Sequence, residues 1–125
     1  MRLPIAACLL LWANAGLAAE PDQPMDGTWT VDLSADPAQP YTKPMVLALQ
    51  ADGTVKGSFY ESEILVGRWK SDRGRTCVSF RTTDGAGPYH TAACRSGDRI
   101  EGQTWAEHRN FLFNWNATRA PASQP

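Results

Sequence analysis

The sequence predicts an all-β fold, an eight-stranded antiparallel up-and-down β-barrel with one disulfide. From Thr28 onward, apolar and β-branched residues alternate with polar ones, and no 3.6-residue period is long enough for a helix. Turn signals rich in Asp, Gly, Pro and Asn break this alternation at short, regular intervals. Sequential strands joined by short turns form a meander, and a meander of this length removes its exposed edges by closing into a barrel.

The expected strands follow one another with few residues between them. The Pro-rich segment ADPAQPYTK separates the first two, and ADG, a tight turn near Glu63, DRGR, DGAGP, SGD and HRN separate the others. In chain order the strands are Thr28–Ser34, Pro44–Gln50, Thr54–Ser62, Ile64–Ser71, Thr76–Thr83, Tyr89–Arg95, Arg99–Glu107 and Phe111–Arg119.

The DGAG turn predicts the register of one hairpin. If Asp84 and Gly87 close a two-residue turn, the antiparallel ladder places Cys77 directly opposite Cys94. Of the three cysteines, Cys8 lies in an N-terminal segment with the pattern of an export signal, described below, so the exported protein would keep two thiols, Cys77 and Cys94. Such a protein most simply pairs them. A loop of this size suggests a stabilisation of roughly 3 kcal/mol.

The first segment, MRLPIAACLLLWANAGLAAEPD, has the pattern of a secretory signal peptide. Its apolar run from Leu3 to Ala13 is shorter than the roughly 20 residues that cross a bilayer as a helix. Small residues favour cleavage after Ala18 or Ala19. An alternative interpretation keeps and acylates Cys8, although the apolar run continues past it. We therefore expect a protein that is secreted or periplasmic after loss of the signal peptide, residues 1–19.

The rest of the chain predicts one small domain, and no apolar segment in it is long enough to span a membrane. We expect a flexible segment at 20–26, the barrel at 27–119 and a disordered tail at 120–125, because both ends are rich in Pro and small polar residues. The net charge is −1, and the chain has no basic run. These features argue against a nucleic acid as the partner.

No metal or cofactor site is expected. His90 and His108, with the two paired cysteines, lack the tight spacing of a zinc site. Motifs for a nucleophile elbow, a zinc protease or a phosphate loop are absent from the sequence. No spacing brings the histidines together with acids, so we assign no catalytic residues and do not expect an enzyme.

The two ends of the barrel sequence resemble the calycin superfamily of avidins and lipocalins. The first strand opens with GTW, which contains Trp29, and the last closes with WNATR, which runs from Trp115 to Arg119. In that superfamily a first-strand tryptophan packs against an arginine from the last strand. The resemblance implies that Arg119 stacks on Trp29 and plugs one end of the barrel, with Trp115 in the core. We expect alanine at either partner to destabilise the fold by similar, non-additive amounts.

The avidin branch is the most similar, because ADGTVKGSFYES, GRWKS and RIEGQTW also resemble avidin fragments in the same order. Two first-strand positions that hold biotin's ureido oxygen in avidins are Val31 and Ala35 here. Their apolar side chains would leave a buried ureido group unsatisfied, at roughly 1 to 3 kcal/mol per group. The resemblance therefore implies the fold without tight biotin binding.

The candidate ligand-binding residues are aromatic. Tyr60 and Trp105 fall near avidin's ligand positions, Trp69 lies on the following strand, and Tyr89 follows the stiff DGAGP loop. The tryptophans have an alternative role as core filler. Neither face of the strand that contains Trp105 is cleanly apolar, which favours an interior with polar groups, water or a ligand. A bulge, for example at GSFYE, would also explain the mixed phase.

Two functions fit these expectations. The first is an exported binding protein whose barrel holds a small, partly apolar ligand other than biotin at its open end. The alternative is a protein-interaction module, such as an inhibitor of a secreted hydrolase, whose loops or N-terminal segment reach into the partner.

Overall fold

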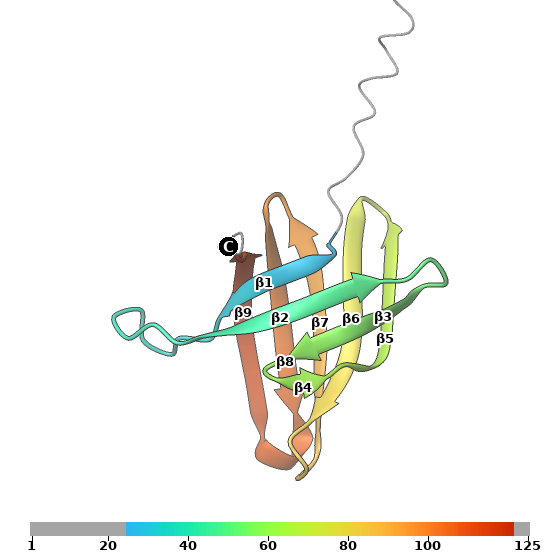
Figure 1. The fold of residues 1–125 in the computed structure, drawn as a ribbon. Coiled ribbons are helices and arrows are strands. Elements are labelled where there is room, and N and C mark those ends of the chain that lie inside the picture. The colour runs from blue at the N-terminus through green and yellow to red at the C-terminus, as the bar shows by residue number, and fades with distance from the viewer. Residues whose placement is uncertain (1–24, 122–125) are drawn as a thin grey trace, which may run out of the picture.

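The computed structural model describes residues 25–121 and confirms the all-β barrel. The predicted signal peptide and most of the two expected flexible ends lie outside the described residues. The elements, labelled in Figure 1, are β1 (Gly27–Asp32), β2 (Thr42–Leu49), β3 (Thr54–Phe59), β4 (Ser62–Glu63), β5 (Leu65–Asp72), β6 (Arg75–Thr83), β7 (Pro88–Ser96), β8 (Arg99–Ala106), the 3₁₀ turn η1 (Glu107–Arg109) and β9 (Phe111–Arg119).

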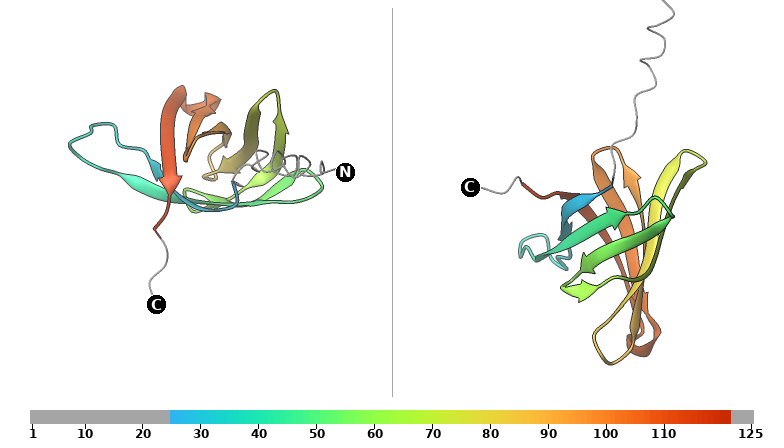
Figure 2. Two further views of the ribbon diagram at one scale, coloured as in Figure 1. Left: turned by 90° about the horizontal axis from the view of Figure 1, so that it is seen from above. Right: turned by 45° about the vertical axis from the view of Figure 1, so that its right-hand side comes forward.

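Eight of the strands form a closed antiparallel ring. Each pairs with its neighbours in sequence, β3 pairs with β5, and β1 closes the ring by pairing with β9. The two-residue strand β4 is a short addition that pairs with β3. The view from above in Figure 2 shows the strands arranged around the barrel axis. Within residues 25–121, no helix is long and apolar enough to cross a membrane.

The two ends of the barrel differ. At the closed end, β1 begins and β9 ends. At the open end lie the β1–β2 connection, the β3–β4 turn, the β6–β7 turn and η1 (Figure 1). The β1–β2 connection, residues 33–41, extends well beyond the barrel wall in the same view.

The closed end contains the contact between the first and last strands. Trp29 is buried, and its Nε1 donates to the carbonyl of Met25 at 2.9 Å. The guanidinium carbon of Arg119 lies 4.3 Å from the centre of the Trp29 ring, and its Nη1 donates to the carbonyl of Asp26 at 2.5 Å. Arg119 is itself exposed and covers the indole from the solvent side at this end of the barrel.

The β6–β7 hairpin has the predicted register. Cys77 faces Cys94 in the ladder, and the two sulfur atoms are bonded at 2.04 Å. Val78 and Ala93 form the next pair and are buried, whereas the cysteines lie in the outward phase of the two strands. The bridge therefore joins the two strands on the outer side of the wall.

Most predicted strand bounds differ from the observed ones by one to three residues, and the irregularity in the register lies in a different strand from the bulge suggested at GSFYE. The third strand ends at Phe59, because Tyr60 and Glu61 have φ angles of 56° and 65° and turn the chain before Ser62. The irregular register lies in β5 between Leu65 and Arg68, and GSFYE carries no bulge. The seventh predicted strand ends at Ala106, after which η1 begins.

Candidate functional site

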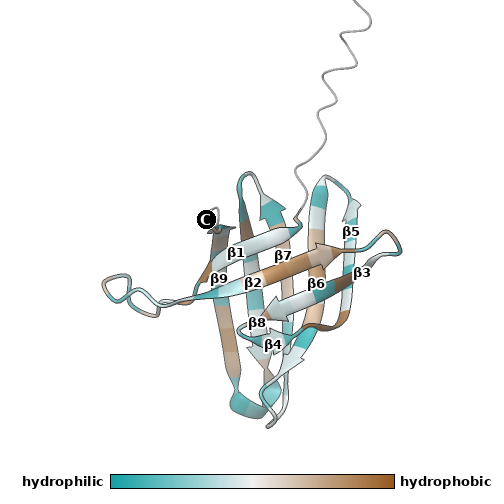
Figure 3. Ribbon diagram, in the orientation of Figure 1, coloured by the Kyte–Doolittle hydropathy of each residue, from teal (hydrophilic) through white to brown (hydrophobic). Residues whose placement is uncertain are grey.

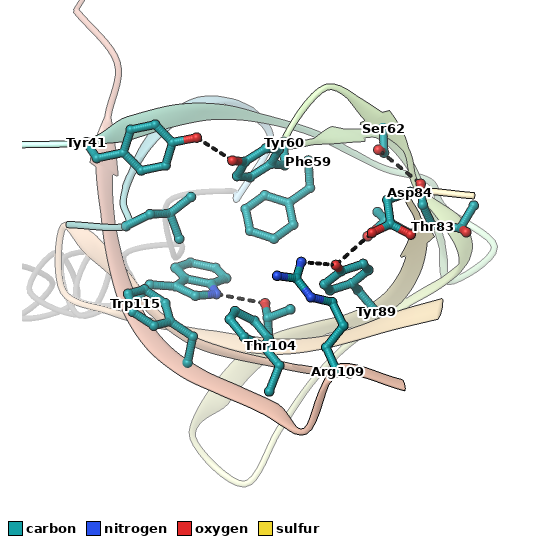
Figure 4. A pocket seen from close by; sticks show the side chains of 14 residues that line it. Tyr41, Phe59, Tyr60, Ser62, Thr83, Asp84, Tyr89, Thr104, Arg109 and Trp115 are labelled. Atoms are coloured by element: carbon teal, nitrogen blue, oxygen red, sulfur yellow. Dashed lines mark hydrogen bonds between the residues drawn. The ribbon is translucent and has the colours of Figure 1, made fainter. Parts of the chain in front are cut away.

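A cavity of about 400 Å³ opens at the open end of the barrel. This volume lies within the range of roughly 300 to 1,000 Å³ that is typical of small-molecule pockets. Figure 4 shows the side chains converging on it from around the barrel wall. The lining residues are Leu33, Tyr41, Phe59, Tyr60, Ser62, Thr82, Thr83, Asp84, Tyr89, Thr104, Arg109, Phe111, Phe113 and Trp115.

The inner part of the cavity is aromatic. Phe59 and Trp115 are buried, with ring centres 5.4 Å apart, and Phe113 lies one inward position nearer the opening than Trp115 on β9. Gly102 makes room for the indole, because a Cβ at this position would lie 2.4 Å from Cζ2 of Trp115. A glycine on β8 thus allows a tryptophan from β9 to form part of the cavity floor.

Buried threonines add hydroxyl groups to this aromatic interior. The Nε1 of Trp115 donates to Oγ1 of Thr104 at 2.9 Å, and that hydroxyl bonds the hydroxyl of Thr91 at 2.8 Å. Thr82, which is 5% exposed, lies in the inward phase of β6 with Phe80. Its hydroxyl has no hydrogen-bond partner among residues 25–121. A buried hydroxyl without a partner costs free energy, so this group is suited to bind a ligand atom or a water molecule.

One side of the opening consists of two tyrosines. The hydroxyl groups of Tyr41 and Tyr60 are hydrogen-bonded to each other. Lys43 lies beside them, with its Nζ 5.2 Å from the Tyr60 ring centre and 3.6 Å from a carboxylate oxygen of Glu61. The hydrogen bond with Tyr41 and, to a lesser extent, desolvation raise the pKa of Tyr60. Tyr60 therefore stays neutral over a wider pH range than a solvated tyrosine.

The other side of the opening is a chain of polar contacts. Arg109 donates from Nη1 to the hydroxyl of Tyr89 at 2.7 Å, and that hydroxyl donates to Oδ2 of Asp84 at 2.8 Å (Figure 4). The backbone N–H of Ala86 also donates to Asp84, and these two bonds lower the pKa of that carboxyl. The bond to Tyr89 raises the pKa of Arg109. Both charges are thus present at neutral pH.

The turn η1 holds Arg109 close to the β6–β7 turn. The ring of His108 lies 5.3 Å from that of Tyr89, and its Nε2 lies 3.9 Å from Oδ1 of Asp84. A Cβ at Gly87 would lie 2.6 Å from the His108 ring, so this close approach requires glycine. Figure 3 shows that the β8–β9 connection is hydrophilic.

The structure brings only two of the four predicted ligand residues to this cavity. Tyr60 and Tyr89 line it, but Trp69 and Trp105 do not. Trp69 packs against the core near the closed end, where its Nε1 donates to the carbonyl of Gln50 at 2.8 Å. Trp105 is 38% exposed on the outer wall and stacks on His90 at 5.4 Å. The inward phase of β8 contains Thr104 instead.

Sequence reasoning missed several cavity residues. The sequence predicts only a turn at Arg109 and only a strand position at Thr82. A usable signal was present, because alternate turns of an up-and-down meander lie at the same end of the barrel. One turn separates the DGAGP and HRN turns along the chain, so these two turns lie at the same end of the barrel. Their order therefore places Tyr89 and Arg109 close together.

The arrangement is suited to binding. Within the described part of the chain, no group of three or more His, Cys, Asp or Glu side chains is placed to hold a metal ion. The site combines an aromatic interior, a buried hydroxyl and a charged opening, which are the usual components of a small-molecule pocket.

The chain matches no protein-family model, no curated protein and no solved structure. The resemblance to the avidins therefore rests on the short sequence fragments described above, and the barrel geometry must support any functional conclusion by itself.

Proposed function

We propose that this chain is an exported binding protein that holds a small, partly apolar ligand in the open-end cavity. The observation that carries the proposal is the cavity of about 400 Å³, with aromatic walls and the hydroxyl of Thr82, which has no hydrogen-bond partner in the described part of the chain. An eight-stranded barrel is just wide enough to be filled by side chains or to hold one small ligand. In this barrel the side chains fill the closed end and leave the open end hollow.

Two further observations support the proposal. The Cys77–Cys94 disulfide is compatible with an oxidising compartment outside the cytosol. Val31, at a position where an avidin has a biotin-binding polar residue, is fully buried in the apolar core. This favours a ligand other than biotin.

A cavity-filling substitution tests the proposal. We expect the neutral fluorescent probe N-phenyl-1-naphthylamine to bind the wild-type protein at one saturable site, with an increase in probe emission. Thr82→Phe places a ring in the cavity and should weaken binding at least about tenfold, or 1.4 kcal/mol. The matched control is Ser79→Phe, which adds the same ring to the exposed face of the same strand and should leave affinity unchanged. Equal affinity for both variants, or no binding to folded wild-type protein, would refute the proposal.

A second candidate function is supported by the projecting β1–β2 connection. This connection is ordered by its own contacts, since Ala38 N–H donates to Asp36 Oδ1 at 3.0 Å and Tyr41 N–H donates to Ser34 Oγ at 2.7 Å. An exposed, internally bonded loop that extends beyond the barrel (Figure 1) has the form of an inhibitory segment that enters a hydrolase cleft. The chain would then act as an inhibitor of a secreted hydrolase.

A shortened loop distinguishes this second function from the first. Replacement of residues 35–39 by Asn-Gly keeps Leu33 and Tyr41 at the cavity but removes the projecting tip. If the chain is an inhibitor, the wild type should inhibit at least one member of a panel of purified secreted proteases and glycoside hydrolases, and the shortened variant should lose at least about tenfold in potency. Unchanged potency, or no inhibition by either protein, would rule out this loop as the inhibitory element.

A further inference from the structure

We propose that the cavity selects amphipathic anions, with the anionic group held by Arg109 beside Tyr89 and Thr82, and the apolar part held by the aromatic interior. This inference rests on the proposed binding function and specifies the chemical class of its ligand. Figure 4 shows the guanidinium of Arg109 extending from the rim toward Tyr89, where an entering ligand would meet it.

Arg109 has hydrogen-bonding capacity to spare. Its Nη1 donates to Tyr89, and its guanidinium carbon lies 5.8 Å from the Phe111 ring centre. Among residues 25–121 it forms no ion pair, and its Nε and Nη2 donate no hydrogen bond. A guanidinium presents its donors in a planar fork that matches a carboxylate. The rim therefore carries a cation whose charge the described residues do not neutralise by direct contact.

Lys43, a second cation near the opening, already contacts a carboxylate and two aromatic rings. Lys43 lies 3.6 Å from a carboxylate oxygen of Glu61 and beside the rings of Tyr41 and Tyr60. It does not line the cavity. Among the residues that line the cavity, Arg109 is thus the one that carries a positive charge and could contact an anionic ligand.

Asp84, the one acidic residue among those lining the cavity, is poorly placed to attract a cationic ligand. Its carboxylate accepts hydrogen bonds from Tyr89 and from the Ala86 backbone, and it faces His108 at 3.9 Å. A cationic ligand would have to displace these donors. An anion would instead meet the free donors of Arg109.

Thr82 supplies a second donor in the same place. It pairs with Tyr89 across the β6–β7 ladder, so the two side chains point to the same inner face of the wall. Its buried hydroxyl can therefore donate to the head group that Arg109 holds. Phe59, Phe113 and Trp115 lie deeper and would contact the apolar body.

Matched competitors test this inference. Nonanoate, nonanamide and nonylamine share one chain and differ in the charge of the head group at pH 7. Each is used to displace N-phenyl-1-naphthylamine from the wild-type protein. We expect nonanoate to displace the probe at about tenfold lower concentration than nonanamide, as one charge-assisted contact to Arg109 implies. Nonylamine should be the weakest competitor.

Arg109 variants locate the effect. Arg109→Gln should bring the nonanoate-to-nonanamide ratio close to one, while Arg109→Lys should keep part of the preference. The matched control is Arg75→Gln, which removes the same charge at the closed end of the barrel and should keep the full preference. Probe affinity is measured first for each variant, and the nonanoate-to-nonanamide ratio is then compared within that variant, so that a change in probe affinity cancels.

The outcomes separate the two proposals. Equal competition by nonanoate and nonanamide, or an anion preference that survives Arg109→Gln, would overturn the head-group inference and leave the cavity function standing. Tighter binding of nonylamine would overturn it in favour of Asp84. If the probe fails to bind folded wild-type protein, both proposals fall.

Discussion

Replacing Trp29 by alanine is expected to lower the free energy of unfolding by about 3 to 5 kcal/mol, the usual cost of removing a large aromatic side chain from a core. Trp29 is 1% exposed and packs in the closed-end core, and its Nε1 hydrogen bond to Met25 would be lost as well. Urea unfolding monitored by far-ultraviolet circular dichroism measures the change. Trp105→Ala removes the same side chain from the outer wall and should cost much less, as a surface substitution does.

The partner of Trp29 should contribute less than the sequence alone suggested. We expected similar losses from Trp29→Ala and Arg119→Ala, but the arginine is exposed while the tryptophan is buried. A cation–π contact at an exposed site contributes about 0.5 to 1 kcal/mol. Arg119→Ala should therefore lower the free energy of unfolding by less than Trp29→Ala does. The double variant should lose less unfolding free energy than the sum of the two single losses. Strict additivity in this cycle would show that the contact at 4.3 Å contributes nothing to stability.

The hairpin containing the disulfide could be read from the sequence because local signals determine it. The DGAG turn and the alternation of Val78, Phe80 and Thr82 together fix which residues face each other. The connection is longer than the predicted two-residue turn, since the last paired residues are Thr83 and Pro88, but it has the predicted centre, and the pairing of Cys77 with Cys94 is therefore the predicted one. Closure of the barrel followed from the number of strands and the shortness of their connections.

The turn after β3 could not be read in the same way. Tyr60 and Glu61 adopt positive φ angles that residues other than glycine and asparagine rarely adopt, and no Gly, Asn or Pro marks this position. The sequence therefore looked like one long strand to Ser62. Tertiary context must stabilise this turn, and the bond between Tyr60 and Tyr41 is one such contact.

Only half of the predicted ligand residues line the cavity, for a related reason. A tryptophan is apolar enough for either face of a strand, so Trp105 was expected inside although its phase places it outside with His90. The hollow itself depends on which side chains fill the closed end, which is a property of the three-dimensional packing. The order of the turns along the chain, in contrast, does predict that Tyr89 and Arg109 lie close together.

Removal of the disulfide is the second substitution with a large expected effect. The Cys77→Ser, Cys94→Ser double variant should lose about 3 kcal/mol of unfolding free energy, because the bridge closes a loop between residues 17 apart in sequence and restricts the unfolded chain. The bonded residues lie opposite each other in a ladder that would still pair without them. The double-serine variant should therefore stay folded, and should still bind the probe in its cavity, at urea concentrations below its own unfolding transition.

Urea unfolding of wild-type and double-serine proteins, each with and without a reducing agent, measures this effect. Reduction should shift the wild-type midpoint to nearly that of the variant and should leave the variant unchanged. The cysteines occupy the outward phase of β6 and β7, so the substitution adds no polar atom to the buried interior next to Val78 and Ala93. If the variant instead lost probe binding while still folded, the bridge would be needed to shape the cavity, and its contribution could not be described as chain entropy alone.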